Sequence, residues 1–363
     1  MERLLRPIFF LLIVACSACA PKNVEQTAAK SMPILPSYKA KIYTLAPTLP
    51  RDPLVRELLI GLPYDESLAG AATAISLAIG QDQPLDGADV NWACLRSGWP
   101  YPLTGHRQLI LPKDSDPAAL IQDLQLTPTS RIGVVRARSS ESDVWVLLQS
   151  EIPVAMNALS MEQDINSTLA IPGPSSESLI WTMADPEGHE HTVSNSILLD
   201  QVGEWLLEAN SPDGQRYRAA IYVDMDIPET SLISPEDPVS GAEARANQAH
   251  RMITESHQLF FDTEQELVRE PNLDRSAAIA LKAILSGEEI SSAELRFEQL
   301  GFTKAPRHEI GCTGETVRTC LDGLIWSTKN RGKLLARDHE AIGISTMTLE
   351  NGQLMMMINL AAD

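Results

Sequence analysis

The spacing of apolar residues changes character twice along this chain of 363 residues, and that change most constrains its fold. From Asp52 to about Gly80 apolar residues recur at helical spacing, and Asp65 is expected to cap the second helical run. Three short strands follow, over 107–111, 131–138 and 144–149. A helix is predicted between the first two strands, over 117–124. Residues 51–150 are therefore predicted to form an α+β domain.

Residues 151–230 show a different pattern, in which short apolar or alternating runs are separated by turn residues. Asp185-Pro186-Glu187-Gly188 and Ser211-Pro212-Asp213-Gly214 are two such turns. Short strands at this spacing without a helical stretch predict a small all-β sandwich. A proline-rich stretch up to Pro238 is then expected to link it to the next domain.

Helical spacing returns in residues 240–363 and ends in a predicted hairpin around Glu350-Asn351-Gly352. The helices are predicted over 244–261, 273–286, 292–300 and 317–326, and the hairpin strands over 341–349 and 354–360. The chain is thus predicted to be multi-domain, with two α+β domains on either side of an all-β one.

Composition narrows the possible partners. The length suits two or three domains, and 29 Lys+Arg against 48 Asp+Glu give a net charge of −19. Binding to nucleic acid requires clustered basic residues, which this acidic sequence lacks, so no nucleic-acid partner is expected.

The first residues have the features of an export signal. Arg3 and Arg6 precede a short apolar run, Ile8–Ala15, which is too short to cross a bilayer. Residues 1–15 are therefore predicted to be a signal peptide. Residues 16–50 are rich in proline and are predicted to be an exposed tether.

The four residues Ile13-Val14-Ala15-Cys16 resemble the lipobox of bacterial lipoproteins. The resemblance implies cleavage before Cys16 and a membrane anchor of diacylglycerol on its sulfur. Cys19 is the competing position, but it would put Cys16 where an aliphatic residue is expected. A plain signal peptide is the alternative. Ser17, in place of an aspartate, favours the outer membrane, so a lipid-anchored protein of the bacterial cell envelope is expected.

Several stretches of residues 240–363 resemble the CAP superfamily of cysteine-rich secretory proteins, antigen 5 and pathogenesis-related proteins. Residues 320–335, with Leu324-Ile325-Trp326-Ser327-Thr328-Lys329-Asn330-Arg331, resemble the family pattern L-W-x-S-P-x-H-R. Ala341-Ile342-Gly343-Ile344 resembles the I-G-V-G strand that follows. Gly301-Phe302 and Arg307-His308-Glu309-Ile310 stand where the family has Gly-Tyr and Gly-Glu-Asn-hydrophobic. The resemblance implies an α-β-α sandwich.

The family's cleft carries two histidines and two glutamates that can hold a divalent metal, but this sequence departs from that set. Asn330 stands in place of a histidine, Thr328 replaces the neighbouring proline, and the region of the other histidine is shortened to Ser286–Glu289. Only Glu309 is matched to a cleft residue. Neutral asparagine is a poor substitute for imidazole. A residual binding cleft at Glu309 and Asn330 is therefore expected, with no metal, cofactor or catalytic residue.

The first α+β segment has a fainter likeness to the same family. Tyr64–Ala72 resembles the entry to the family's second helix, Leu95–Pro100 its L-x-x-x-G-Y turn, and Ile132-Gly133-Val134-Val135 its I-G-V-G strand. The likeness implies that residues 51–150 are a divergent second copy of the domain.

Cys312 and Cys320 lie eight residues apart in a chain predicted to be exported, so a disulfide is favoured over two buried thiols. Cys19 and Cys94 have no assigned partner.

Other chemical signals are weaker. His189-Glu190-His191 could present two imidazoles for a metal, although a solvated hairpin is the more common meaning of such a pair. Met355–Met357 lie in the last predicted strand, where alternation sends one set into the core and another outward. Core packing is the expected role, and an adaptable binding surface is the alternative. Trp326 is expected in the core. The sequence has no Gly-x-Ser-x-Gly, P-loop, HExxH or paired Cys-x-x-Cys motifs.

These observations favour a noncatalytic binding or scaffolding module for an envelope protein, glycan or lipid. The alternatives are a hydrolase or metal-dependent enzyme using Glu309 in the residual cleft, and a structural spacer. The missing histidine at position 330 disfavours the enzyme, because general base catalysis near neutral pH usually needs imidazole or a tuned carboxylate pair.

Overall fold

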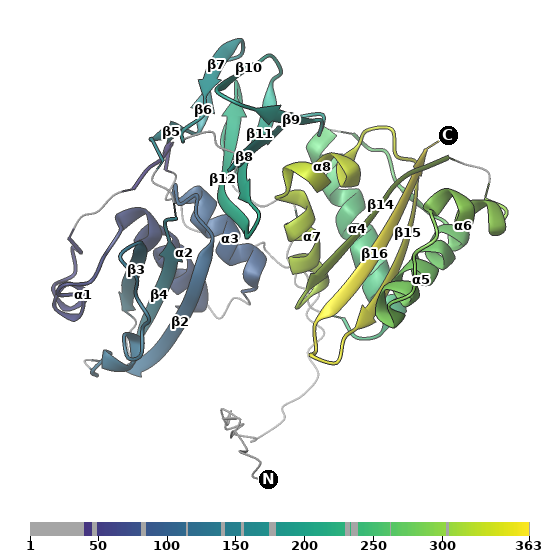
Figure 1. The fold of residues 1–363 in the computed structure, drawn as a ribbon. Coiled ribbons are helices and arrows are strands. Elements are labelled where there is room, and N and C mark those ends of the chain that lie inside the picture. Colours follow the sequence, from purple (N-terminus) through teal and green to yellow (C-terminus); the bar gives the residue numbers. More distant parts are fainter. Residues whose placement is uncertain are drawn as a thin grey trace, which may run out of the picture. The chain divides into compact units, whose positions relative to one another are not determined.

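Helices and strands follow the predicted α+β, all-β, α+β order in the computed structural model of the chain (Figure 1). The structure describes residues 40–45, 49–80, 85–113, 115–138, 142–153, 156–173, 179–228, 233, 239–261, 263–302 and 305–362, without the side chains of 305–307. The chain is therefore a multi-region protein of mixed helices and several small sheets.

The first region packs helices on a three-stranded antiparallel sheet of order β2-β4-β3. Its helices are α1 (Pro53–Leu58), α2 (Glu66–Gly80) and α3 (Gly87–Arg96), and its strands are β2 (Leu103–Pro112), β3 (Ser130–Arg138) and β4 (Ser142–Glu151). Helix α2 contacts β3 and β4. Asp65 accepts hydrogen bonds from the backbone N–H groups of Ser67 at 2.9 Å and Leu68 at 3.5 Å, which confirms the predicted cap.

Two helices of this region differ from the prediction. The helix expected over 117–124 is only a single turn, Ala118–Leu120, because Asp123 adopts a left-handed backbone with φ 58° that a helix cannot continue through. Helix α3 was not predicted. Asp86 and Asp89 start it through a reciprocal capping box, which is visible in the sequence only as two acidic residues three apart.

The middle region is all-β but is only partly the predicted sandwich. Five strands form one sheet of order β6-β12-β11-β8-β9, and two others, β7 and β10, form a separate two-stranded sheet. The second layer that a sandwich requires is therefore small. The strands are β5 (Leu159–Ser160), β6 (Glu162–Gln163), β7 (Ser167–Ala170), β8 (Ile180–Ala184), β9 (Glu190–Val193), β10 (Ser196–Leu199), β11 (Gly203–Ser211) and β12 (Gly214–Val223).

The predicted tether is shorter than the sequence indicated. A short strand, β1 (Ile42–Tyr43), pairs with β5, and the Tyr43 side chain is buried. The Tyr43 hydroxyl accepts a hydrogen bond from the backbone N–H of Ala220 at 3.0 Å. Residues 40–45 thus belong to the packed protein, and the rest of the predicted signal peptide and tether up to residue 39 lies outside the described residues.

The C-terminal region places helices on both faces of a four-stranded sheet of order β13-β15-β16-β14 (Figure 1). Helices α5 and α6 lie on one face, and α4, α7 and α8 on the other. The helices are α4 (Ala242–Phe261), α5 (Pro271–Ser286), α6 (Ala293–Gln299), α7 (Val317–Ile325) and α8 (Thr328–Leu335). The strands are β13 (Val268–Arg269), β14 (Ala305–Gly314), β15 (Ala341–Thr348) and β16 (Leu354–Ala362). The predicted hairpin is confirmed by the β15–β16 pairing.

The first and last regions share their local construction. The sheet orders β3-β4-β2 and β15-β16-β14 correspond, and each region has a parallel bridge just before its main helix, Tyr64 to Ile132 and Arg269 to Ile342. A glycine in the bridged strand then meets the helix start: Gly133 lies against the Leu68 backbone, and Gly343 lies against that of Leu273.

The close approach at Gly343 gives a test of this packing. A Cβ at position 343 would overlap the backbone of Leu273, so we expect Gly343→Ala to lower the free energy of unfolding by about 3 kcal/mol. Gly323→Ala is the control, because its Cβ would meet nothing within 4 Å inside helix α7. That control should gain about 0.5 to 1 kcal/mol in urea unfolding. Equal stability of the two variants would contradict the packing.

Candidate functional site

The segment that resembles the family's cleft motif, Ser327–Gly332, lies against the middle region. Thr328 is buried at the start of α8 and donates hydrogen bonds from its backbone N–H and its Oγ1 to Glu208 Oε2, at 2.8 and 2.9 Å. Glu208 is on strand β11 and is itself buried. Threonine in place of the family's proline supplies both donors, because proline has neither an N–H nor a hydroxyl.

Arg331, one turn further along α8, is wholly buried and forms an ion pair with Glu204 of the same strand. Its guanidinium lies over two aromatic rings, with its central carbon 4.7 Å from the centre of Phe260 and 5.8 Å from that of Trp326. These contacts compensate a desolvated cation through a carboxylate and through ring faces. The predicted burial of Trp326 is confirmed.

The same segment approaches a turn of the middle region closely. The backbone of Gly332 contacts that of Gly188, and a Cβ on either residue would overlap the other. Gly188 also has φ 86°, a conformation that L side chains rarely adopt. Side chains on Thr328 and Arg331 and the bare backbone at Gly332 therefore all serve contact with the middle region.

Helix α7 binds the first region through a buried charged cluster. Arg318 donates to both carboxylate oxygens of Asp89, at 2.6 and 2.9 Å, and to Asp86 at 2.9 Å. Next to this cluster, Asn91 Nδ2 donates to Asp322 Oδ2 at 3.1 Å. Bidentate geometry is what allows such a desolvated ion pair to be tolerated.

Asp322 is the residue of this contact whose burial opposes folding most. Its Oδ1 atom is buried without a partner among the described residues. Burial raises the pKa of the Asp322 carboxyl to about 6, although the hydrogen bond from Asn91 and the charges of Arg218 and Arg318 lower it in part.

The raised pKa of Asp322 predicts a pH-dependent stability difference. A proton stays on the folded carboxyl up to about pH 6 but leaves the unfolded one near pH 4, so stability is lost as the pH rises through that window. We expect Asp322→Asn to equal the wild type at about pH 4 and to exceed it by up to about 3 kcal/mol above pH 6, measured by urea unfolding.

Asp89→Asn is the matched control, because it removes a paired carboxylate from the same junction. It should destabilise the protein by about 3 to 5 kcal/mol at neutral pH, since it leaves Arg318 with less compensation. Identical pH profiles for wild type and Asp322→Asn would contradict the assignment.

The structure does not bring Glu309 and Asn330 together. Glu309, on β14, forms an ion pair with the buried Arg296 of α6, and the amide of Asn359 lies 2.9 Å from it once that amide is oriented by its neighbours. The next residue, Ile310, points to the opposite face, into the core formed with Leu334 and Leu335 of α8. Asn330 lies on α8, and its amide is 3.4 Å from the Ser327 hydroxyl.

His308, two residues before Ile310 on β14, lies on the same face of the sheet as Ile310, and the sequence did not single it out as a site residue. Its ring centre is 5.6 Å from that of His339. The pKa of His339 is lowered to about 4, chiefly by burial, with the neighbouring His308 and His257 acting in the same direction. Burial also lowers the pKa of His257. His339 Nε2 is hydrogen-bonded to the backbone carbonyl of Lys333, and His257 Nε2 to that of Ala336. Strand alternation along Arg307–Ile310 was the available signal.

The histidine pair that the sequence singled out, His189 and His191, converges on Asp185. His189 Nδ1 and His191 Nε2 lie 3.2 and 3.0 Å from Oδ2 of the buried Asp185. The other carboxylate oxygen, Oδ1, accepts hydrogen bonds from the backbone N–H groups of Glu187 and His189. Asp185 begins the turn that the sequence indicated. Within the described residues, no group of three His, Cys, Asp or Glu side chains is arranged to hold a metal ion.

The predicted disulfide is confirmed: Cys312 of β14 is bonded to Cys320 of α7, with the Cα atoms 5.5 Å apart. Cys94 is a free, buried thiol, and burial raises its pKa to about 12. Cys16 and Cys19 lie outside the described residues. Met356 and Met357 are buried, as expected.

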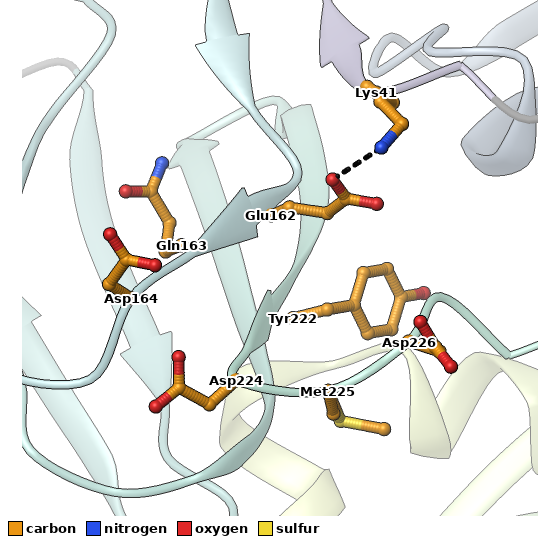
Figure 2. Close-up of a pocket in the computed structure, with 8 residues that line it drawn as sticks. All are labelled: Lys41, Glu162, Gln163, Asp164, Tyr222, Asp224, Met225 and Asp226. Carbon is orange, nitrogen blue, oxygen red and sulfur yellow. Dashed lines mark hydrogen bonds and ion pairs between the residues drawn. The ribbon is translucent and has the colours of Figure 1, made fainter.

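A hollow of about 700 Å³ lies between β6 and the turn after β12, and Figure 2 shows the residues that line it. It is lined by four carboxylates, and one of them, Glu162, is paired with Lys41 at 2.8 Å. The carboxylates of Asp164, Asp224 and Asp226 are spread around the rim (Figure 2). The hollow is therefore strongly acidic and open.

A smaller pocket of about 250 Å³ lies where the three regions meet. Its walls come from the end of α3 and the loop after it, from the start of β12, and from α7. The residues that give it polar and aromatic character are Asn91, Trp99, Tyr101, Gln215 and Arg218. We call it the junction pocket. Beside it the first and middle regions contact each other directly, because the backbone N–H of Arg218 donates to the carbonyl of Pro100 at 2.8 Å.

No protein-family model matches the chain, and no curated protein does. Two solved structures are similar at 12% identity. An outer surface protein from Borrelia burgdorferi has a TM-score of 0.30, over 34% of this chain and 98% of its own. A cysteine-rich secretory protein from Staphylococcus aureus has a TM-score of 0.28, over 73% of this chain and 86% of its own. At these levels neither structure assigns an activity.

Proposed function

We propose that this chain is a lipid-anchored protein of the bacterial cell envelope, in which a degenerate CAP-like domain, residues 240–363, serves as part of a noncatalytic binding or scaffolding module. The helices on both faces of the β13-β15-β16-β14 sheet support the CAP-like assignment. The position of the quoted motifs supports it too, since Leu324-Ile325-Trp326-Ser327 joins the end of α7 to the start of α8, and the I-G-I segment is in β15.

One observation carries the noncatalytic assignment: the segment that corresponds to the cleft motif is occupied by contacts within the protein. Thr328 is bonded to Glu208, Arg331 to Glu204, and Gly332 lies against Gly188. A substrate would have to displace these buried contacts, at a cost of several kcal/mol for an uncompensated charge. The segment is therefore suited to holding the regions together.

We also infer that the first region is a second, more divergent copy of the same domain. The shared sheet order, the parallel bridge and the glycine that admits the helix start all support it. The turns after α3 and α6 are also alike. Gly98 and Gly301 have φ of 81° and 68°. In each turn the backbone N–H of the next residue, Trp99 or Phe302, donates at 2.9 Å to a carbonyl of the preceding helix.

The alternative is a hydrolase or metal-dependent enzyme that uses Glu309. The specific observation in its favour is that Glu309 retains partial exposure, with 22% of its side chain accessible. Its pairing with Arg296 opposes this reading, because an ion-paired carboxylate is a weak base. The proposed partner therefore remains an envelope protein, glycan or lipid, bound without turnover.

The membrane anchor is tested by substitution of its cysteine. Every helix of the described residues is too short or too polar to span a bilayer. If the lipid on Cys16 is the anchor, Cys16→Ala should move the protein from the membrane to the soluble fraction, while Cys19→Ala should leave it in place. Fractionation without detergent measures this. Release by Cys19→Ala alone would move the anchor to that residue, and release by neither variant would contradict a lipid anchor.

The noncatalytic assignment is tested with the lipid-free protein and isolated cell envelopes. Wild type and Glu309→Gln should co-sediment with the envelopes equally and release no soluble fragments detectable by mass spectrometry. Asn330→Ala, on the other face of the sheet, should behave in the same way. Fragments released by wild type and lost in Glu309→Gln would instead support the hydrolase, and an absence of co-sedimentation would contradict the binding module.

A further inference from the structure

The junction pocket is lined by polar side chains, each of which has hydrogen-bonding atoms that no other described residue binds. Three of its side chains are each held by one hydrogen bond to a carboxylate. Asn91 Nδ2 donates to Asp322 at 3.1 Å, Gln215 Nε2 to Glu208 at 3.2 Å, and Arg218 Nε to Glu208 at 3.4 Å. A carboxylate accepts only, so these contacts fix which end of each amide faces it.

The opposite end of each group remains available. Asn91 Oδ1 and Gln215 Oε1 are acceptors, and Arg218 Nη1 and Nη2 are donors, with no hydrogen-bond partner among the described residues. Because Asn91 and Gln215 come from different regions, the acceptors are contributed separately, from α3 and from β12. The pocket thus presents acceptors and a paired donor to one small space.

The charge around the pocket disfavours an ionic ligand. Arg218, with 17% of its side chain exposed, is already balanced by Glu208, and Asp322 lies close enough to be influenced by it. An added anion would meet two carboxylates. An added cation would find both Glu208 oxygens occupied, by Gln215 and Arg218 on one and by Thr328 on the other. A neutral ligand that both donates and accepts hydrogen bonds is the remaining class.

The rest of the wall is apolar and aromatic. Trp99 and Tyr101 are buried and line the pocket, with ring centres 5.4 Å apart. A pyranose combines hydroxyl groups that donate and accept with apolar C–H faces, and one such ring suits a space of about 250 Å³. We propose that the junction pocket binds one neutral sugar unit of an envelope glycan. The proposal deepens the binding function above and rests on it.

The first test is direct binding to the purified, lipid-free full-length mature protein. Saturation-transfer difference NMR with glucose, galactose and N-acetylglucosamine should show saturable binding of at least one sugar, with a dissociation constant of the order of millimolar. Benzoate and cyclohexanol serve as an anionic and a poorly hydroxylated comparator. Saturable benzoate binding without sugar binding would overturn the neutral class, and an absence of saturable binding by all three sugars would overturn the proposal.

Variants then locate the site. Gly323 lines the pocket, and a side chain there would enter open space, so Gly323→Leu should obstruct the pocket without strain. Arg218→Lys removes the paired donors and keeps the charge. Each should weaken sugar binding by about tenfold or more. The controls are Gly80→Leu, which also enters open space, and Arg216→Lys on the same strand, which pairs with Asp213; both should bind as the wild type does.

The outcomes separate this proposal from the function on which it rests. Sugar binding that survives Gly323→Leu, in a variant with the thermal stability of the wild type, would place the sugar elsewhere and overturn the pocket assignment. If Gly323→Leu still co-sediments with envelopes and the wild type shows no sugar binding, the proposed binding module is supported and the sugar site in the pocket is contradicted. If the wild type fails to co-sediment with envelopes, the proposed function itself is contradicted.

Discussion

The buried ion pair between Arg331 and Glu204 is the constraint on which the rest of the structure depends. A guanidinium with no exposed surface is tolerated only if a carboxylate and polarisable neighbours compensate it. Glu204 and the rings of Phe260 and Trp326 provide that compensation. Glu204 is on β11 of the middle region, Phe260 is on α4, and Trp326 follows the end of α7. The relative placement of α8 and the five-stranded sheet therefore follows from electrostatics as well as from apolar packing.

A second set of polar contacts repeats this principle at α7. Arg318 forms ion pairs with Asp89 of α3 and with Asp86, which caps that helix. The C-terminal region therefore binds both of its neighbours through arginines on successive helices. Between those two arginines lies the family-like stretch whose histidine is absent. Thr328 and Arg331 of this stretch instead provide buried contacts with the middle region.

Periodicity was enough to predict most elements of the fold. The helices at 242–261 and 271–286, the terminal hairpin, and the disulfide were predictable because each depends on local spacing. Helices α3 and α8 were not. Helix α3 begins with the Asp86–Asp89 capping box, and α8 (Thr328–Leu335) is polar until Leu334 and Leu335, so neither has a clear apolar repeat at its start. The candidate site was predicted poorly. Glu309 and His308 are adjacent in sequence, and only the register of β14 decides which of them faces α8.

The long separation of the ion-paired partners has a consequence for how the chain is made. Asp89 is synthesised 229 residues before Arg318, and Glu204 precedes Arg331 by 127. Until the last part of the chain is present, Asp89 and Glu204 lack the cations that they are buried against in the native state. The packing around these two carboxylates is therefore completed only when α7 and α8 have been made.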